Sequence, residues 1–382
     1  MWSEDYNVGR LTLDMELSTF CNARCPQCSR TEELNNVKKK EWLPLTSVTV
    51  AKFKKWFPPE DLDHIKNFHF SGTYGDPGMC KDLYKIVSYI IDNSTTAKIS
   101  INTNGSMRDE MFWWKIGAKG QKRLVVMFDI DGIDQEMHNF YRRGTTLSKV
   151  LNNMSAVLDT PAIVTVFTVL FKHNQNYLND IHDMCNKLGY ITKFDWVEAN
   201  NFESPIYPFN DEEGNPLQLE QVTSDRPEIN AVNLDGSLIP ASVTDDSERQ
   251  SRRVRDHRHL PLIKDYTEIK CHAIERNNLK VSVDGLITPC CHLSPSLERF
   301  SVDGTWIHAR NMRSSVDWLN LGWKAPISPI IQEYIDNPTA YNLNHNSISD
   351  IVNSQWFNKS LPDSWNDLKD SCFGCRKVCG KK

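Results

Sequence analysis

The chain reads LTLDMELSTFCNARCPQC from Leu11 to Cys28, and this stretch decides its fold. The run Leu11–Glu16 is typical of a β-strand. Three cysteines follow at positions 21, 25 and 28, with the spacing C-x3-C-x2-C, in the loop that leaves the C-terminal end of this strand. Barrels and open parallel sheets place their chemistry at that end of their strands. The stretch therefore predicts an α/β protein with a reactive or metal-binding loop after its first strand.

Further strand-like runs follow this first one at regular intervals. They span residues 67–71, 98–102, 124–130, 163–171 and 192–197. Amphipathic helical patterns lie between them, at residues 83–90, 147–157 and 178–188, the last of which we expect Gly189 to end as a C-cap. Strands that alternate with helices predict parallel βαβ units. Six such units favour a partial (β/α)6 TIM-like barrel rather than a closed eight-stranded one.

The pattern changes after about residue 200, which suggests how the chain is divided. With 382 residues, the chain is too long for one ordinary domain. We expect the barrel to span residues 1–200. Residues 201–265 are rich in Pro, Asp, Glu and Arg, which is typical of a linker or an insertion that covers the active site. Residues 266–382 resume short strands and turns, and we expect a small α+β domain there.

Composition and charge exclude several function classes. A net charge of −5 does not suggest a general nucleic-acid binder, although a local basic patch stays open. The longest apolar stretch, residues 161–171, is too short to span a membrane. The first residues, MWSEDYNVGR, lack the features of a signal peptide. We therefore expect a protein of the reducing cytoplasm, with no membrane partner.

Eleven cysteines are present, and nine of them fall into two groups near the two ends of the chain. In a reducing compartment a disulfide framework is not expected, so the grouping indicates metal or iron–sulfur ligation. The first group, Cys21, Cys25 and Cys28, offers three thiolates where a four-iron cluster normally takes four. One iron would then stay open for a substrate or cofactor. The alternative is a structural zinc site, which usually shows four ligands in paired C-x2-C motifs.

The first cysteine group resembles the signature of the radical S-adenosylmethionine (radical SAM) superfamily, C-x3-C-x-aromatic-C. Gln27 stands where the family has its aromatic residue. Four later stretches resemble the family's strand-end motifs: SGTYGDP at 71–77, NTNG at 102–105, DIDG at 129–132 and HNFYRRG at 138–144. Each one alone is more often an ordinary turn, but together they follow predicted strands in the family's order. The resemblance implies that S-adenosylmethionine is bound by Gln27, Gly75, Asp76, Asn102, Asn104, Asp129, Arg142 and Arg143.

The second cysteine group resembles the SPASM/twitch extensions of the same superfamily, which bind auxiliary iron–sulfur clusters. It has the pattern C-x13-G-x4-C from Cys271 to Cys290, followed by Cys372-x2-Cys375-x3-Cys379. Spacing alone leaves a [4Fe–4S] cluster and a zinc ion equally open. The resemblance favours one auxiliary [4Fe–4S] cluster on Cys271, Cys290, Cys372 and Cys375, with Cys379 as a possible replacement. We expect Cys291 to be a neighbour rather than a ligand, since adjacent residues point in opposite directions on an extended chain.

Three features outside these groups admit a plain structural interpretation. We expect Cys185, on the apolar face of a helix, to be a core residue. Cys80 follows the Asp76-Pro77 turn, and we favour packing there over hydrogen-atom donation. Arg252, Arg253, Arg255 and Arg258 lie in a charged stretch that is either a solvated loop or a reader of an anionic substrate.

The resemblance implies an oxidoreductase or modifying enzyme that cleaves S-adenosylmethionine reductively to a 5′-deoxyadenosyl radical. That radical removes a hydrogen atom from the substrate. A flavodoxin- or ferredoxin-like electron donor is implied as a partner. For the substrate, modification of a peptide or protein by oxidation, epimerisation or crosslinking is the first hypothesis, and dehydrogenation of a small sugar- or cyclitol-like molecule is the second. A non-enzymatic iron–sulfur or zinc protein and a nucleic-acid-modifying enzyme are the weaker alternatives.

Overall fold

The computed structural model describes most of the chain outside the insertion and part of the C-terminal region. The described residues are 1–31, 37–41, 43–199, 206–223, 268–291, 293, 299–302, 305–308, 328–337, 339–367, 370–372, 375–376 and 379–381. The four arginines between 252 and 258 lie outside these residues, as does most of the predicted insertion.

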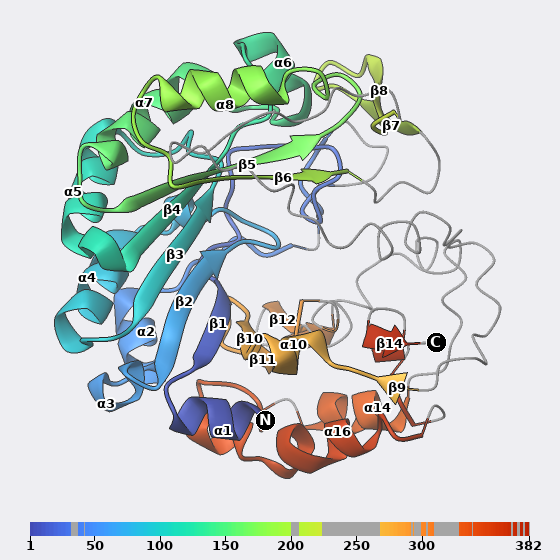
Figure 1. The fold of residues 1–382 in the computed structure, drawn as a ribbon. Coiled ribbons are helices and arrows are strands. Elements are labelled where there is room, and N and C mark those ends of the chain that lie inside the picture. The colour runs from blue at the N-terminus through green and yellow to red at the C-terminus, as the bar shows by residue number, and fades with distance from the viewer. Residues whose placement is uncertain are drawn as a thin grey trace.

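One curved sheet forms the centre of the fold (Figure 1), and its eight strands follow the order β11-β10-β1-β2-β3-β4-β5-β6. Its strands are β1 (Leu11–Glu16), β2 (Ile65–Ser71), β3 (Lys98–Thr103), β4 (Leu124–Asp129), β5 (Ile163–Leu170), β6 (Lys193–Glu198), β10 (Asn278–Val281) and β11 (Ile287–Thr288). Strands β1 to β6 are parallel and adjacent in chain order. Because the order ends at β6 and at β11, the sheet is open, which confirms the predicted partial six-unit α/β barrel.

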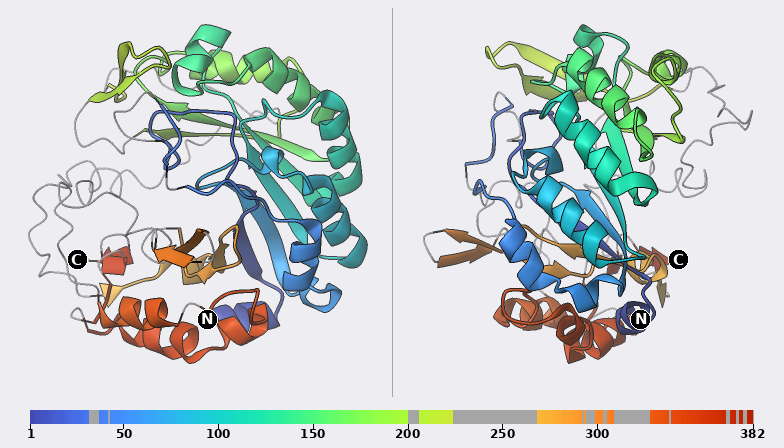
Figure 2. Two further views of the ribbon diagram at one scale, coloured as in Figure 1. Left: turned by 180° about the vertical axis from the view of Figure 1, so that it is seen from behind. Right: turned by 90° about the vertical axis from the view of Figure 1, so that its left-hand side faces the viewer.

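Helices cover the convex face of this sheet (Figures 1 and 2). Those of the barrel are α2 (Val50–Trp56), α3 (Pro59–Leu62), α4 (Leu83–Asn93), α5 (Glu110–Gly120), α6 (Gln135–Tyr141), α7 (Leu147–Leu158) and α8 (Leu178–Asn186). The apolar faces expected for α4, α7 and α8 are buried in the core. The expected C-cap at Gly189 is wrong: Lys187 is the C-cap of α8, and Leu188 is already 39% exposed.

Alternation along each strand separates the two faces of the sheet. On β3, for example, Ile99 and Ile101 are buried in the core, whereas Ser100 and Asn102 are half-buried. Side chains at successive strand positions point to opposite faces. Since Asn102 lines the cavity described below, the second set faces the concave side of the sheet. The concave side is therefore the polar side, and it is available for binding.

The C-terminal region extends the barrel sheet. Strand β10 pairs in parallel with β1, and β11 pairs antiparallel with β10. The remaining elements of this region are β9 (Glu268–Ile269), α10 (His272–Glu275), β12 (Arg299–Val302), β13 (Thr305–His308), α14 (Pro329–Asp336), α15 (Ile348–Val352), η4 (Trp356–Ser360), α16 (Leu361–Asp363) and β14 (Gly380–Lys381). Strands β9 and β14 form a small antiparallel pair.

The N-terminal helix α1 (Trp2–Asn7) lies beside the C-terminal helices (Figure 2). The ring of Trp2 packs edge-on against Phe357, with 5.7 Å between the centroids, and Ser3 Oγ donates a hydrogen bond to Asn358 Oδ1 at 3.0 Å. The N-terminal helix is thus tied to the C-terminal region at η4.

Among the described residues, none of the helices has the length and apolarity that crossing a membrane would require.

Candidate functional site

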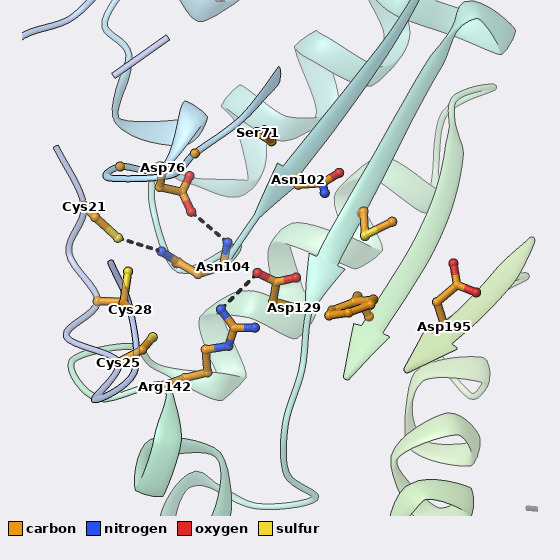
Figure 3. A pocket seen from close by; sticks show the side chains of 15 residues that line it. Cys21, Cys25, Cys28, Ser71, Asp76, Asn102, Asn104, Asp129, Arg142 and Asp195 are labelled. Atoms are coloured by element: carbon orange, nitrogen blue, oxygen red, sulfur yellow. Dashed lines mark hydrogen bonds and ion pairs between the residues drawn. The ribbon is translucent and has the colours of Figure 1, made fainter. Parts of the chain in front are cut away.

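Three cysteines line one end of a cavity of about 410 Å³ at the carboxyl ends of the barrel strands (Figure 3). Cys21, Cys25 and Cys28 come from the loop after β1. Hydrogen bonds within the loop fix its path: Cys28 N donates to Cys25 O at 3.1 Å, and Thr31 N donates to Cys28 O at 2.8 Å. The short loop thus points three thiols into a single concave space.

Burial controls the acidity of these thiols. It raises the pKa of Cys25 to about 12, while the nearby Arg142 opposes this rise, and it also raises the pKa values of Cys21 and Cys28. Thiolates, not thiols, bind metal, so a bound metal must displace the protons. Raised pKa values of this kind do not favour a free thiolate nucleophile.

Among the described residues, no three His, Cys, Asp or Glu side chains gather closely enough to hold a single metal ion. In a cubane cluster each thiolate binds a different iron, so its ligands need not converge on one point.

Asp76 ties the loop after β2 to the end of β3. Its buried carboxylate accepts hydrogen bonds from Thr103 Oγ1 at 2.8 Å, Asn104 N at 2.8 Å and Gly78 N at 2.7 Å. Burial raises the pKa of Asp76, and these three donors counteract the rise. All three bonds favour the charged form, and they fix the position of the carboxylate at the rim of the cavity.

Gly75 lets this loop approach β1 closely. A Cβ atom at this position would lie only 1.9 Å from Ser18 O. The backbone of the next residue bonds to the same segment, since Asp76 N donates to Phe20 O at 2.8 Å. The glycine is therefore required by the contact between the β2 loop and the segment that leads into the cysteines.

Asn104 connects the end of β3 to the cysteine loop. Its amide Nδ2 donates to Asn22 Oδ1 at 3.0 Å and lies 3.6 Å from Cys21 Sγ (Figure 3). A donor at this distance from a sulfur stabilises negative charge on it.

Arg142 follows helix α6 and enters the cavity between two carboxylates. Its Nη1 lies 3.0 Å from Asp129 Oδ2, and its Nε lies 2.5 Å from Asp131 Oδ2. Burial opposes the charge on Arg142, yet the two carboxylates raise its pKa well above the ordinary value. Burial also raises the pKa of Asp129 to about 7, against the influence of Arg142.

Most of the residues predicted for the site line this cavity, but Gln27 and Arg143 do not. The predicted residues that line the cavity are Cys21, Cys25, Cys28, Gly75, Asp76, Asn102, Asn104, Asp129 and Arg142. Gln27 is not among the lining residues, and Arg143 binds Glu212 on the far side of the loop. Two adjacent arginines thus have different roles, which their sequence could not reveal.

The cavity also has lining residues that motif comparison missed, namely Ser71, Met127, Phe167 and Asp195. Asp195, on β6, lies at the end opposite the cysteines in Figure 3. Its Oδ2 pairs with Lys193 Nζ at 2.7 Å. Strand alternation was the available signal, because each of these residues sits on the concave side of its strand.

The second cysteine group also converges. A small cavity is lined by Cys271, Cys290, Cys375 and Cys379, and Cys375 N donates to Cys372 Sγ at 3.2 Å. A hydrogen bond between Cys271 and Cys379 raises the pKa of the first thiol and lowers that of the second to about 6. Four cysteines therefore line one small cavity, and a fifth, Cys372, lies beside Cys375.

The remaining cysteines lie apart from both groups. Cys291 is exposed and does not line the small cavity; the charged groups that act on its thiol are those of Asp14, Lys280 and Arg276. Cys185 is fully buried in the core. Cys80 is also fully buried, and its thiol donates to Val48 O at 3.3 Å.

Comparison with known proteins finds a family whose model matches part of this chain. Residues 15–185 match the model of the radical SAM superfamily. Among curated relatives, the GTP 3′,8-cyclase of Campylobacter curvus is 22% identical over 289 residues, covering 75% of this chain and 81% of the relative. The GTP 3′,8-cyclase of Campylobacter jejuni (strain RM1221) is 21% identical over 287 residues, with the same coverage.

Solved structures with a similar chain path include Streptococcus suis SuiB bound to S-adenosylmethionine, with a TM-score of 0.44 and 14% identity over 84% of this chain and 68% of that one. They also include anSMEcpe with bound AdoMet, with a TM-score of 0.49 and 13% identity over 91% of this chain and 82% of that one.

Proposed function

This chain is an enzyme that carries the radical SAM domain over residues 15–185, and on that premise we propose that Cys21, Cys25 and Cys28 hold its [4Fe–4S] cluster. The convergence of their three thiols at one end of the cavity carries the proposal. When bound, the cluster and S-adenosylmethionine supply a one-electron reductive cleavage that produces a 5′-deoxyadenosyl radical. The three-cysteine set leaves one coordination position for S-adenosylmethionine.

The cavity wall between the cysteines and Asp195 would bind S-adenosylmethionine. Of the two candidate arginines, Arg142 is the better placed partner for a carboxylate, because it lines the cavity and Arg143 does not. A bound carboxylate would share its guanidinium with Asp129 and Asp131. Asp76, Asn102, Asn104 and Asp129 supply acceptors and donors along the same wall. Met127 and Phe167 supply apolar surface for a ring.

We place one auxiliary [4Fe–4S] cluster at the second cysteine group. Cys271, Cys290 and Cys375 line the small cavity in agreement with the proposed set. Cys379 lines it too, whereas Cys372 does not, so Cys379 competes with Cys372 for the fourth position. The division into a barrel at 1–200, an insertion at 201–265 and a SPASM/twitch-like domain at 266–382 belongs to this proposal. A flavodoxin- or ferredoxin-like protein would supply the electrons.

Modification of a peptide or protein is our first proposal for the reaction, supported by the likeness of the C-terminal cysteines to SPASM/twitch extensions. A small polar substrate is the second candidate. It is favoured by the polar concave wall, where Ser71, Asn102 and Asp195 face the cavity, and by the nucleotide-cyclising activity that the relatives' names print.

Deuterium transfer separates the two substrate classes. Extract from source cells grown in deuterated medium is split by ultrafiltration into small molecules and polypeptides, and each fraction is added to the reduced enzyme with S-adenosylmethionine. Deuterium in the 5′-deoxyadenosine made with the polypeptide fraction alone supports the first proposal. Deuterium that appears only with the small-molecule fraction overturns it in favour of the second.

A further inference from the structure

Arg143 does not line the cavity but binds a hairpin that the reaction as described does not use. This hairpin consists of β7 (Ile206–Asn210) and β8 (Pro216–Glu220), and Glu212 lies in its turn. Arg143 Nε donates to Glu212 Oε2 at 3.0 Å, and Arg143 Nη2 contacts the same oxygen. The side chains of Arg143 and Glu212 are only 11% and 23% exposed, so the pair is largely shielded from water.

The same carboxylate also faces the cysteine loop. Glu212 Oε1 lies 3.8 Å from Nε of Arg24, which stands between Cys21 and Cys25. Arg24 N in turn donates to Arg143 O at 2.8 Å. One carboxylate therefore contacts two arginines whose backbones are already hydrogen-bonded to each other, which closes a ring of contacts around the loop.

Further contacts join the hairpin region to this loop. Tyr207 Oη donates to Pro26 O at 3.2 Å, directly beside Cys25. On the other side, Asn22 Nδ2 donates to Gly144 O at 3.4 Å. The loop is thus contacted after Cys25 by the hairpin and before Cys25 by the segment that follows α6.

The hairpin is itself anchored to the barrel. Phe209 and Leu219 are buried in a separate apolar cluster with Val37 and Phe171. The guanidinium of Arg143 lies 5.8 Å from the centroid of the Phe209 ring. Because the hairpin is packed in this way, its contacts can hold the cysteine loop in a defined position.

We propose that Glu212 is a positioning residue: through Arg143 and Arg24 it holds the Cys21–Cys28 loop in the arrangement that accepts the iron–sulfur cluster. The inference rests on the proposed function, because it assigns the cluster to these cysteines. Glu212 touches none of the three thiols, so it acts only through the loop. Loss of its charge leaves the shielded guanidinium of Arg143 without its partner, and the loop opens more often.

Alkylation of the metal-free protein tests this directly. Glu212→Gln and the matched control Glu213→Gln remove one charge each from the same turn, and Glu213 is exposed. The rate at which N-ethylmaleimide modifies Cys25 and Cys28 is followed anaerobically by peptide mass spectrometry. We expect about a three- to tenfold faster rate in Glu212→Gln, as local opening becomes more frequent, and an unchanged rate in Glu213→Gln. Equal rates in Glu212→Gln and wild type overturn the inference.

A second readout uses the reconstituted protein. The electron paramagnetic resonance spectrum and midpoint potential of the first cluster should shift in Glu212→Gln and stay at wild-type values in Glu213→Gln. If Glu212→Gln does not fold, Glu212→Asp carries the test, since it keeps the charge but draws the carboxylate back from Arg143 and Arg24; an unchanged alkylation rate in that variant then overturns the inference. Failure of the wild-type protein to take up a cluster would instead contradict the proposed function, and the alkylation rates distinguish the two failures.

Discussion

Arg142 Nη1 lies 3.0 Å from Oδ2 of Asp129, so the arginine that we propose as the partner of a cofactor carboxylate already has a carboxylate partner. Asp131, which is fully buried, holds the other edge of the guanidinium. The orientation of Arg142 is therefore set before any ligand binds. Preorganised charge of this kind lowers the cost of binding.

Replacing Arg142 by Gln should destabilise the metal-free protein by about 3 kcal/mol, because it leaves the buried carboxylate of Asp131 without its charged partner. Urea denaturation measures the loss. Arg10→Gln is the control: Arg10 is 60% exposed and pairs with Asp5 at 3.2 Å, so its loss should be below about 1 kcal/mol. Equal losses in the two variants would show that Arg142 is not held as the structure indicates.

His138 should make the stability of the metal-free protein depend on pH. Burial lowers its pKa to about 4, and its Nδ1 accepts the N–H of Asp131 at 3.2 Å. Between about pH 6.5 and pH 4 the unfolded chain takes up a proton that the folded chain refuses, so stability falls as pH falls through this window.

The comparison variant is His138→Asn, which retains an acceptor but does not titrate. Its stability deficit relative to wild type should shrink by about 2–3 kcal/mol between pH 6.5 and pH 4. Denaturation curves at several pH values measure the deficit. A deficit that is constant over this range would show that His138 is not buried in its neutral form.

Gly75→Ala should disrupt the site far more than Gly78→Ala. The new Cβ at position 75 would lie 1.9 Å from the backbone oxygen of Ser18, whereas at position 78 the nearest atom is Asp76 Oδ1 at 3.0 Å. The clash at position 75 is between backbone segments, which cannot move apart as a flexible side chain could. We therefore expect Gly75→Ala to lower the free energy of unfolding by at least ~2 kcal/mol more than Gly78→Ala does. Thermal or urea denaturation measures it. Indistinguishable variants would argue against the close approach of the β2 loop to β1.

Iron content should distinguish ligand cysteines from core cysteines. Cys375→Ala should lower the iron of the reconstituted protein from about eight to about four per chain, as expected if one of two four-iron clusters is lost. Cys185→Ala should leave it unchanged, since Cys185 is buried among apolar residues away from both groups. An iron content near four per chain in the wild-type protein would contradict the presence of an auxiliary cluster.

The strands of the barrel were predictable because local pattern determines them. The predicted first and last residues of all six strands agree with the observed ones within two residues. Each strand buries one face under helices, which gives it a clear local pattern. The pairing of β10 with β1 was not predictable: Thr12 and Asn278 are register partners, and no local pattern reports a contact across that distance. The cysteines and strand-end motifs could be placed on one rim, because the carboxyl ends of parallel strands meet there.

At the site, the sequence could not predict which side chains contact one another. Arg142 and Arg143 are adjacent, and only the fold shows that one faces Asp129 and the other Glu212. Asp195 follows no motif and was found only through its place on the concave side of β6.

Release of 5′-deoxyadenosine tests the central claim most directly. Anaerobically reconstituted and reduced protein is incubated with S-adenosylmethionine, and the product is measured by chromatography and mass spectrometry. We expect release by the wild-type protein and none by Cys21→Ala, Cys25→Ala or Cys28→Ala. No release from wild-type protein whose first cluster is intact and reduced would contradict this claim.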